Sequence, residues 1–419
     1  MRLRSLILIA LVAISIEAAP RRRAVSKPTI DPSTIDGWLI ANTHLLVADE
    51  YIPYDLDLEP LRTMIGSATI VGLGDGTHGT HQFFTMKMRI IDFLAREEGF
   101  DVVAFEGPFP LMNRMDAYVQ GGAGNARELA SAMKPLAYLF WNSEEMVQLL
   151  EWMRQYNATR GDRPALRIAG FDIFEPYPAS REVLTYLRDV DPPAAATAES
   201  LYACITPSAF VVTGPCNDSA VTVLQALTPK EAAYTALTSA AAYAEAQQYA
   251  RVVTQAVEGG GPNRDAGMAA NALWLRANRS ATHKIILWAH NAHLSKTSTE
   301  LAPYTVMGQT LSASLAGDYF NVATLTAAGA IRQWQPGSRT PILTTIPALT
   351  PANLESDLRK RDAPRFIIPL RGDVPEWLSR KRPYITAGTY GNPQSTDSIT
   401  TQFDAAIFID TTSPITDLP

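Results

Sequence analysis

The sequence predicts an α/β fold: a mostly parallel central sheet flanked by helices, with an additional helical segment near residues 222–280 beside the active-site cleft. Short apolar runs rich in β-branched residues alternate along the chain with stretches in which apolar residues recur at helical spacing. This alternation is typical of parallel sheets built from βαβ units. The chain has 419 residues, of which 47% are hydrophobic, so it can bury a large core.

The predicted elements follow one another along the chain. Apolar runs predict strands at residues 67–74, 101–106, 166–171, 283–289, 319–325, 365–370 and 405–410. Helical spacing predicts helices at residues 82–98, 109–119, 126–133, 144–156, 222–258, 264–279 and 307–316. Residues 192–220 are rich in Pro, Ala, Thr and Ser, and we expect them to form an insertion or loop.

The first residues have the pattern of a secretory signal peptide. Two arginines within the first four positions precede an apolar run over residues 5–16, and small residues follow at Ala18 and Ala19. A membrane anchor is the alternative, but the run is shorter than the ~20 apolar residues that cross a bilayer. We therefore expect residues 1–18 to be a signal peptide, residues 19–39 a loose N-terminal segment and residues 40–419 a single domain of a secreted or periplasmic protein.

Composition limits the partners of the protein. The net charge of −6 argues against nucleic acid, since phosphate binding needs a basic surface. No later stretch has the length of a membrane span, so we expect no stable membrane insertion, and we expect a monomer. The two cysteines, Cys204 and Cys216, are close in sequence. In a secreted chain this favours a disulfide, with a stabilisation of ~3 kcal/mol, over two free buried thiols.

Four of the six histidines lie in two clusters directly after predicted strands. His78 and His81 follow the strand at 67–74, and His290 and His293 follow the strand at 283–289. Because the carboxyl ends of parallel strands meet at one edge of the sheet, where ligands bind, we expect these side chains to converge. The acidic residues at the ends of the predicted strands are Asp75, Glu106 and Asp172.

These residue types can activate water. A histidine whose ordinary pKa is ~6.5 can accept a proton from water, a carboxylate can stabilise the resulting imidazolium, and a second histidine can donate to an oxyanion. No G-x-S-x-G nucleophile elbow occurs, which argues against a serine hydrolase. The same side chains are plausible metal ligands, so a metal-dependent hydrolase is an alternative. His44 and His283 are expected to be structural. His81 and His293 either act directly or only orient their neighbours, and Asp172 either acts directly or only caps the next segment.

A series of motifs resembles the erythromycin esterase family over about residues 40–415. The motifs occur in the family's order, which makes the resemblance specific. They are Gly74–Gly79 (GDGTHG), Phe83-Phe84, Glu106, Asp116–Gly122 (DAYVQGG), Trp152–Asn157, Gly170–Asp172, Arg264-Asp265 with Met268 and Asn271, Trp288–His293 (WAHNAH), Met307-Gly308 and Phe403–Asp410.

The resemblance implies hydrolysis of an ester, best known as the opening of a macrolide lactone ring, without a required metal or other cofactor. By this likeness His78 is the base that activates water, and Asp75, Glu106 and His290 complete the catalytic site. The partner is then a small-molecule ester or lactone. The residues expected to contact it are His293, Lys87, His81 and Asp172.

Two positions depart from the family pattern. The family usually has glutamate at the position of Asp75, and arginine at the position of Lys87, where lysine cannot make a planar two-pronged contact. A misplacement of catalytic groups by about 1 Å can cost ~100-fold in rate. The departures therefore leave open a divergent esterase whose substrate is not a macrolide, a weak or inactive member, and a binding protein without turnover.

Overall fold

The computed structural model describes residues 31–53, 56–134, 138–207, 216–257, 259, 262–300, 302–335, 340–387 and 394–419. The predicted signal peptide lies outside these residues. The strands are β1 (His44–Leu45), β2 (Ile70–Asp75), β3 (Val102–Pro108), β4 (Arg167–Asp172), β5 (Ile285–His290), β6 (Tyr319–Trp334), β7 (Pro341–Thr345), β8 (Arg365–Pro369), β9 (Arg382–Ile385), β10 (Gln394–Asp397) and β11 (Ala405–Thr412).

The helices alternate with the core strands. The α-helices are α1 (Ile35–Asn42), α2 (Glu59–Ile65), α3 (His81–Glu97), α4 (Phe109–Val119), α5 (Ala126–Ser131), α6 (Glu144–Thr159), α7 (Pro176–Val190), α8 (Pro192–Leu201), α9 (Cys216–Leu227), α10 (Glu231–Leu237), α11 (Ala240–Val257), α12 (Pro262–Asn278), α13 (Asn291–Leu294), α14 (Met307–Leu315), α15 (Leu354–Leu358), α16 (Glu376–Ser379) and α17 (Ile399–Gln402). The 3₁₀ helices are η1 (Leu56–Leu58), η2 (Leu139–Trp141), η3 (Tyr202–Cys204), η4 (Thr228–Lys230), η5 (Ala316–Asp318) and η6 (Arg359–Arg361).

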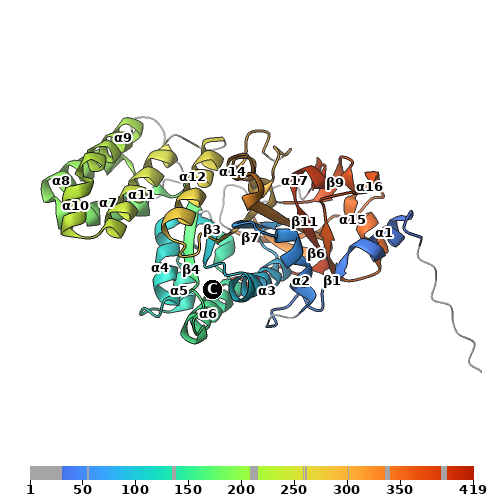
Figure 1. Ribbon diagram of the computed structural model, residues 1–419. Helices are drawn as coiled ribbons and strands as arrows, with labels where there is room; N and C mark the ends of the chain where they lie inside the picture. Colours follow the sequence, from blue (N-terminus) through green and yellow to red (C-terminus); the bar gives the residue numbers. More distant parts are fainter. Residues whose placement is uncertain are drawn as a thin grey trace, which may run out of the picture.

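The central sheet has the strand order β1-β8-β11-β6-β2-β5-β3-β4, and β7 pairs with β6 outside this order (Figure 1). From β11 to β4 each strand runs parallel to its neighbour. At the other edge β8 pairs antiparallel with β11, and β1 pairs antiparallel with β8. The predicted mostly parallel α/β sheet is therefore confirmed.

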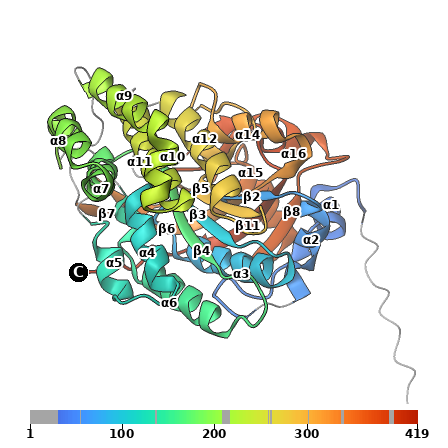
Figure 2. The same ribbon diagram turned by 60° about the vertical axis from the view of Figure 1, so that its left-hand side comes forward.

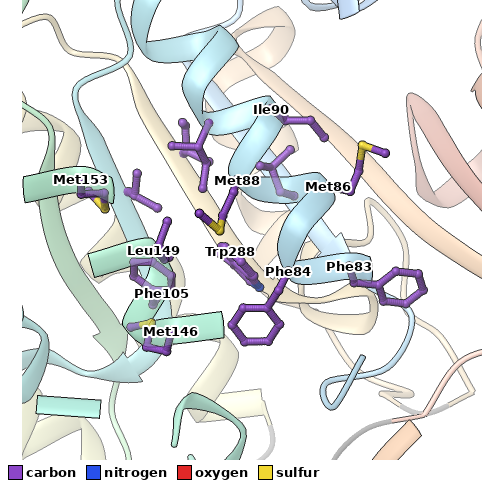
Figure 3. Close-up of a cluster of buried hydrophobic side chains, with 14 of the residues drawn as sticks. Phe83, Phe84, Met86, Met88, Ile90, Phe105, Met146, Leu149, Met153 and Trp288 are labelled. Carbon is purple, nitrogen blue, oxygen red and sulfur yellow. The ribbon is translucent and has the colours of Figure 1, made fainter. Parts of the chain in front are cut away.

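Successive residues of the core strands point to opposite faces of the sheet, and helices cover both faces. Ile286 and Trp288 of β5 face one side, in a cluster that includes α2, α3, α5 and α6, while Ile285 and Leu287 face α7, α11, α12 and α14. Figure 3 shows α3 on the first side, with Phe84 close to Trp288. The two ring centroids are 4.9 Å apart. Strands buried on both faces explain why the core strands appear in the sequence as continuous apolar runs.

A helical extension from α7 to α11 lies at one end of the molecule, coloured green to yellow-green in Figures 1 and 2. The prediction of a loop at residues 192–220 was wrong for the described residues, because α8 covers 192–201 and α9 begins at Cys216. Prolines occupy the first turn of α8, where a missing N–H costs no helical hydrogen bond, and the Asp191 side chain accepts from Ala194 N. Cys204 and Cys216 form a disulfide, which confirms the favoured bridge.

The predicted helical segment at 222–280 divides into two parts. Helix α9 packs on α8 and α11, α10 packs on α11, and α11 packs on α7, whereas α12 packs against β4, β5 and α14 as well as α11. The start of α12 reaches the carboxyl ends of β3 and β4, where Arg264 contacts Glu106 and Asp172. Helix α1 begins at Ile35, within the segment expected to be a loose N-terminus. In the part of the chain that the structure describes, no helix has both the length and the apolar character of a membrane span.

Candidate active site

The ends of four neighbouring parallel strands deliver the acidic and basic side chains. Asp75 is the last residue of β2 and pairs in register with His290, the last residue of β5. Glu106 and Asp172 stand near the ends of β3 and β4, on the far side of β5. All four residues are at most 4% exposed. The expected convergence at the carboxyl edge therefore follows from the strand order.

Two buried groups bind the carboxylate of Asp75. Lys87 of α3 makes an ion pair with Oδ1 of Asp75, and Trp288 Nε1 donates to Oδ2 over 3.1 Å. Burial lowers the pKa of Lys87 to about 8, against the opposing effect of Asp75. Lys87 is completely buried, and its Nζ lies 4.6 Å from the ring centroid of Trp288. The structure thus places Lys87 as the partner of Asp75, whereas the sequence suggested contact with substrate.

His78 lies in the turn between β2 and α3. Its Nδ1 is 3.7 Å from Oδ2 of Asp75 and has no hydrogen-bond partner among the described residues. The imidazole stacks on the ring of Phe140 from η2, with centroids 4.2 Å apart and planes 4° apart. The ring of His290 lies 5.0 Å away. His78 is therefore surrounded by a carboxylate, an aromatic face and a second imidazole.

The backbone after His78 has room only for glycine. A Cβ atom on Gly79 would lie 1.9 Å from the carbonyl oxygen of Arg332 in β6. The carbonyl oxygen of Gly79 accepts a hydrogen bond of 2.8 Å from Arg332 N. The His78 turn is therefore fixed by close backbone contact with β6.

His290 is a neutral hydrogen-bond donor in this arrangement. Its Nδ1 accepts from Ala292 N over 3.2 Å, so the ring proton is on Nε2, which faces Thr386 Oγ1 at 3.4 Å. Burial and the neighbouring His78 hold the pKa of His290 well below its usual value. The backbone N–H of His290 donates to Oε2 of Glu106 over 2.9 Å, which fixes the end of β5.

Arg264 joins Glu106 to Asp172. Arg264 lies at the start of α12. Its Nη2 donates to Oε1 of Glu106 over 2.8 Å, and its Nε donates to Oδ1 of Asp172 over 3.0 Å. Burial raises the pKa of Glu106, but His293, His78 and Arg264 outweigh this effect and hold it below its usual value. Both carboxylates form ion pairs with the same buried guanidinium.

His293 has a carboxylate on each side. Its Nδ1 is 2.9 Å from Oδ1 of Asp265, and its Nε2 is 3.0 Å from Nη1 of Arg264 and 3.6 Å from Oε1 of Glu106. Because the guanidinium can only donate, Nε2 accepts and Nδ1 carries the proton. Burial lowers the pKa of His293, but Asp265 and Glu106 outweigh this effect and raise it. A second proton on Nε2 requires Arg264 Nη1 to move away.

His81 has its contacts outside this cluster. Its Nδ1 lies 2.7 Å from Glu145 of α6, and its Nε2 lies 3.1 Å from Glu50. The hydrogen bond to Glu145 raises the pKa of His81. The structure thus brings together His78, Asp75, Glu106, His290, His293 and Asp172, with Lys87 behind Asp75, and places His81 with another pair of carboxylates.

Several site residues were not selected from the sequence. Arg264 and Asp265 enter the sequence analysis only as part of the family resemblance. Their position at the start of the predicted helix 264–279 is the signal that could have placed them in the site, because helices that follow parallel strands begin near the carboxyl edge of the sheet. Tyr304 lies beside Asp265, and its pKa is raised by burial and by that carboxylate. Phe140 and Thr386 follow no pattern in the sequence that points to the site.

The geometry of the acidic groups bears on the metal alternative. Across the described ranges, no group of three or more His, Cys, Asp and Glu side chains is arranged to hold a metal ion. Instead, the carboxylates at the strand ends are neutralised by Lys87 and Arg264. The carboxylates of Asp75, Glu106 and Asp172 are therefore engaged in ion pairs within the protein.

Comparisons with known proteins connect this site to a family. The family model described as Erythromycin esterase matches residues 95–412. Erythromycin esterase type II of Escherichia coli is 25% identical over 334 residues, which is 68% of this chain and 77% of that protein. The putative hydrolase YbfO of Bacillus subtilis (strain 168) is 34% identical over 140 residues, which is 33% of this chain and 29% of YbfO.

Solved structures share the fold. A protein from Bacillus cereus has a TM-score of 0.80 at 25% identity, covering 92% of this chain and 98% of its own. A protein described as a succinoglycan biosynthesis protein has a TM-score of 0.76 at 24% identity, with coverages of 92% and 98%. An erythromycin esterase variant in its open conformation has a TM-score of 0.68 at 19% identity, with coverages of 86% and 95%.

Proposed function

The chain belongs to the erythromycin esterase family, and we propose that it hydrolyses a carboxylic ester or lactone with a water molecule activated by His78. The observation that carries this proposal is the meeting of His78, Asp75 and His290 at adjacent strand ends. The imidazole rings of His78 and His290 are 5.0 Å apart, and Nδ1 of His78 is 3.7 Å from Asp75.

In the first step His78 acts as a general base. With Nδ1 directed toward Asp75, Nε2 takes a proton from water while the water oxygen bonds to the acyl carbon. Asp75 stabilises the imidazolium that forms, and Lys87 and Trp288 hold the carboxylate in place. No covalent acyl-enzyme is formed.

In the second step the tetrahedral intermediate collapses. His290 is neutral and carries its proton on Nε2, so it can donate to the oxyanion in place of its present contact with Thr386. The carbonyl re-forms, the bond to the leaving alkoxide breaks, and the imidazolium of His78 returns the proton to that oxygen. One water is consumed, and the products are a carboxylic acid and an alcohol.

Arg264 and its carboxylates support this machinery without taking part in proton transfer. Glu106 accepts from the backbone of His290, and Arg264 fixes Glu106 and Asp172. His293 and Tyr304 lie on the Asp265 side of Arg264, and we assign contact with the substrate to this side. The E. coli relative is named for erythromycin, so a macrolide lactone is one substrate to test.

Steady-state hydrolysis tests the proposal. Purified full-length protein is offered macrolides and a panel of simple esters, and compared with His78→Ala and with His44→Ala, an exposed histidine in β1. Loss of general base catalysis predicts a fall of about 100- to 10,000-fold in kcat for the first variant and no change for the second. Equal rates for His78→Ala and wild type contradict the assignment, and binding without turnover across the panel indicates a binding protein.

A further inference from the structure

We propose that residues 413–418, the carboxy-terminal strap, position His78 by holding its backbone and its aromatic support at the same time. The inference rests on the proposed function, because it concerns the geometry of the general base. The strap follows β11 and includes Ile415 and Leu418, which are 2% and 3% exposed.

The first set of strap contacts holds the turn that carries His78. Ile415 N donates to the carbonyl oxygen of Gly79 over 3.2 Å, and His81 N donates to Ser413 O over 2.9 Å. The same Gly79 oxygen accepts from Arg332 N of β6, and Arg332 Nε makes an ion pair of 2.9 Å with Asp417 of the strap. The backbone directly after His78 is therefore held between β6 and the strap.

The second set of contacts holds the segment that carries Phe140. Leu418 N donates to Asn142 O over 3.1 Å, and Asn142 Nδ2 donates to Leu418 O over 3.3 Å. Glu144 N donates to Thr416 O over 2.9 Å. These contacts begin two residues after Phe140, whose ring stacks on the imidazole of His78.

His81 belongs to this second set rather than to the catalytic cluster. Glu145 accepts from Thr416 N with both carboxylate oxygens at 3.2 Å, and its Oε1 is also 2.7 Å from Nδ1 of His81. His81 therefore orients the carboxylate on which the strap is bound. This gives a structural reason for the second histidine of the His78 turn.

The two supports of His78 come from segments far apart in the sequence, and the strap joins them. The turn at Gly79 and the short η2 helix are both outside the regular sheet, so neither is fixed by strand pairing with the other. A shift of about 1 Å between a base and its substrate can cost ~100-fold in rate. Loss of the strap is therefore expected to act on kcat more than on KM.

Two variants test the proposal. The first ends the chain after Pro414, which removes the contacts to Gly79, Asn142 and Glu145. The second is Asp417→Asn, which breaks the ion pair with Arg332, with Asp410→Asn as a matched control. Asp410 lies in β11 and forms an ion pair with Arg359 of η6, and its side chain otherwise accepts from Thr411 Oγ1.

Two readouts separate positioning from turnover. One is kcat and KM for an ester that wild type hydrolyses. The other is the rate at which diethyl pyrocarbonate acylates His78, followed by peptide mass spectrometry with exposed His44 as internal reference. We expect the truncated chain to lose about 100-fold in kcat with little change in KM, and His78 to react about tenfold faster. Asp417→Asn is expected to lower kcat and raise His78 reactivity by about threefold, and Asp410→Asn to leave both unchanged.

A truncated chain that unfolds cooperatively, with kcat and His78 reactivity within about twofold of wild type, overturns the proposal. If the truncated chain does not fold, the point variants decide: equal values for Asp417→Asn and Asp410→Asn overturn it. If wild type hydrolyses no ester, the proposed function fails, and His78 acylation alone still tests the strap. The two failures are thus distinguishable.

Discussion

Replacing Glu355 by glutamine is expected to remove a pH dependence from the stability of the folded chain. Glu355 lies in α15 and is completely buried. Its Oε1 accepts from Ile385 N over 2.7 Å, while its Oε2 is buried and has no hydrogen-bond partner in the described part of the chain. Burial raises the pKa of Glu355 from 4.5 to about 7, and Ile385 precedes Thr386, the residue that faces His290. Glu355 therefore holds the backbone of the residue next to Thr386, which contacts His290 in the site.

The magnitude follows from that pKa. Between pH 4.5 and about 7 the carboxyl is protonated in the folded chain and ionised in the unfolded chain. The folded state then binds more protons, so the free energy of unfolding falls as the pH rises through this window and is constant above it. A change of this size in proton affinity corresponds to roughly 3 kcal/mol. Glutamine carries no charge and cannot show this loss.

Urea unfolding of wild type and Glu355→Gln between pH 4.5 and 7.5 measures the effect. Other groups titrate in both proteins, so the difference between the two free energies isolates Glu355. That difference should favour the variant by roughly 3 kcal/mol more at pH 7.5 than at pH 4.5. Glu376→Gln, an exposed position in α16, should give a pH-independent difference. A pH-independent difference for Glu355→Gln as well would refute the reasoning.

The remaining predictions concern the site and the N-terminus. Asp75→Glu and Lys87→Arg each enlarge a buried ion pair, so each should lower kcat/KM, and because the two side chains are in contact, their effects should couple by about 0.5–3 kcal/mol in the double variant; additive losses would contradict this. Arg264→Met removes the guanidinium that pairs with the buried carboxylates of Glu106 and Asp172 and should cost about 3–5 kcal/mol in urea unfolding; a cost below about 1 kcal/mol would reject the pairing. Ester hydrolysis should survive exhaustive dialysis against a chelator, whereas a loss that zinc restores would favour the metal-dependent mechanism. Exported protein should begin near residue 19 on N-terminal sequencing, and an exported chain that keeps its first residue would exclude cleavage.

The core of the sheet was predictable because its strands are buried on both faces. Residues 70–75 and 285–290 are buried along their whole length, so the apolar runs marked them clearly. β7 is mostly exposed, and β1 has two residues, so neither gave a periodic signal. Prolines at the start of residues 192–201 predict a loop, but in the structure they occupy the first turn of α8, a position that proline tolerates.

The candidate site was predictable only where chemistry and strand ends coincide. His78, His290, Asp75, Glu106 and Asp172 follow strands, and the strand order brings them together. The contact of Arg264 with Glu106 spans 158 residues, and that of Thr386 with His290 spans 96. No local pattern encodes such contacts, because they depend on how helices and loops pack over the edge of the sheet.

The parallel order of the strands has a consequence for how the enzyme acquires activity. Glu106 and His290 are 184 residues apart in sequence. In the sheet, β5 lies between β2 and β3, although both of these strands come much earlier in the chain. Such non-local pairings form late in folding, because a long loop must close first. During refolding with the disulfide intact, helical circular dichroism should therefore return before ester hydrolysis. The recovery of ester hydrolysis would then show when the sheet is complete, whereas circular dichroism would show only when the helices have formed.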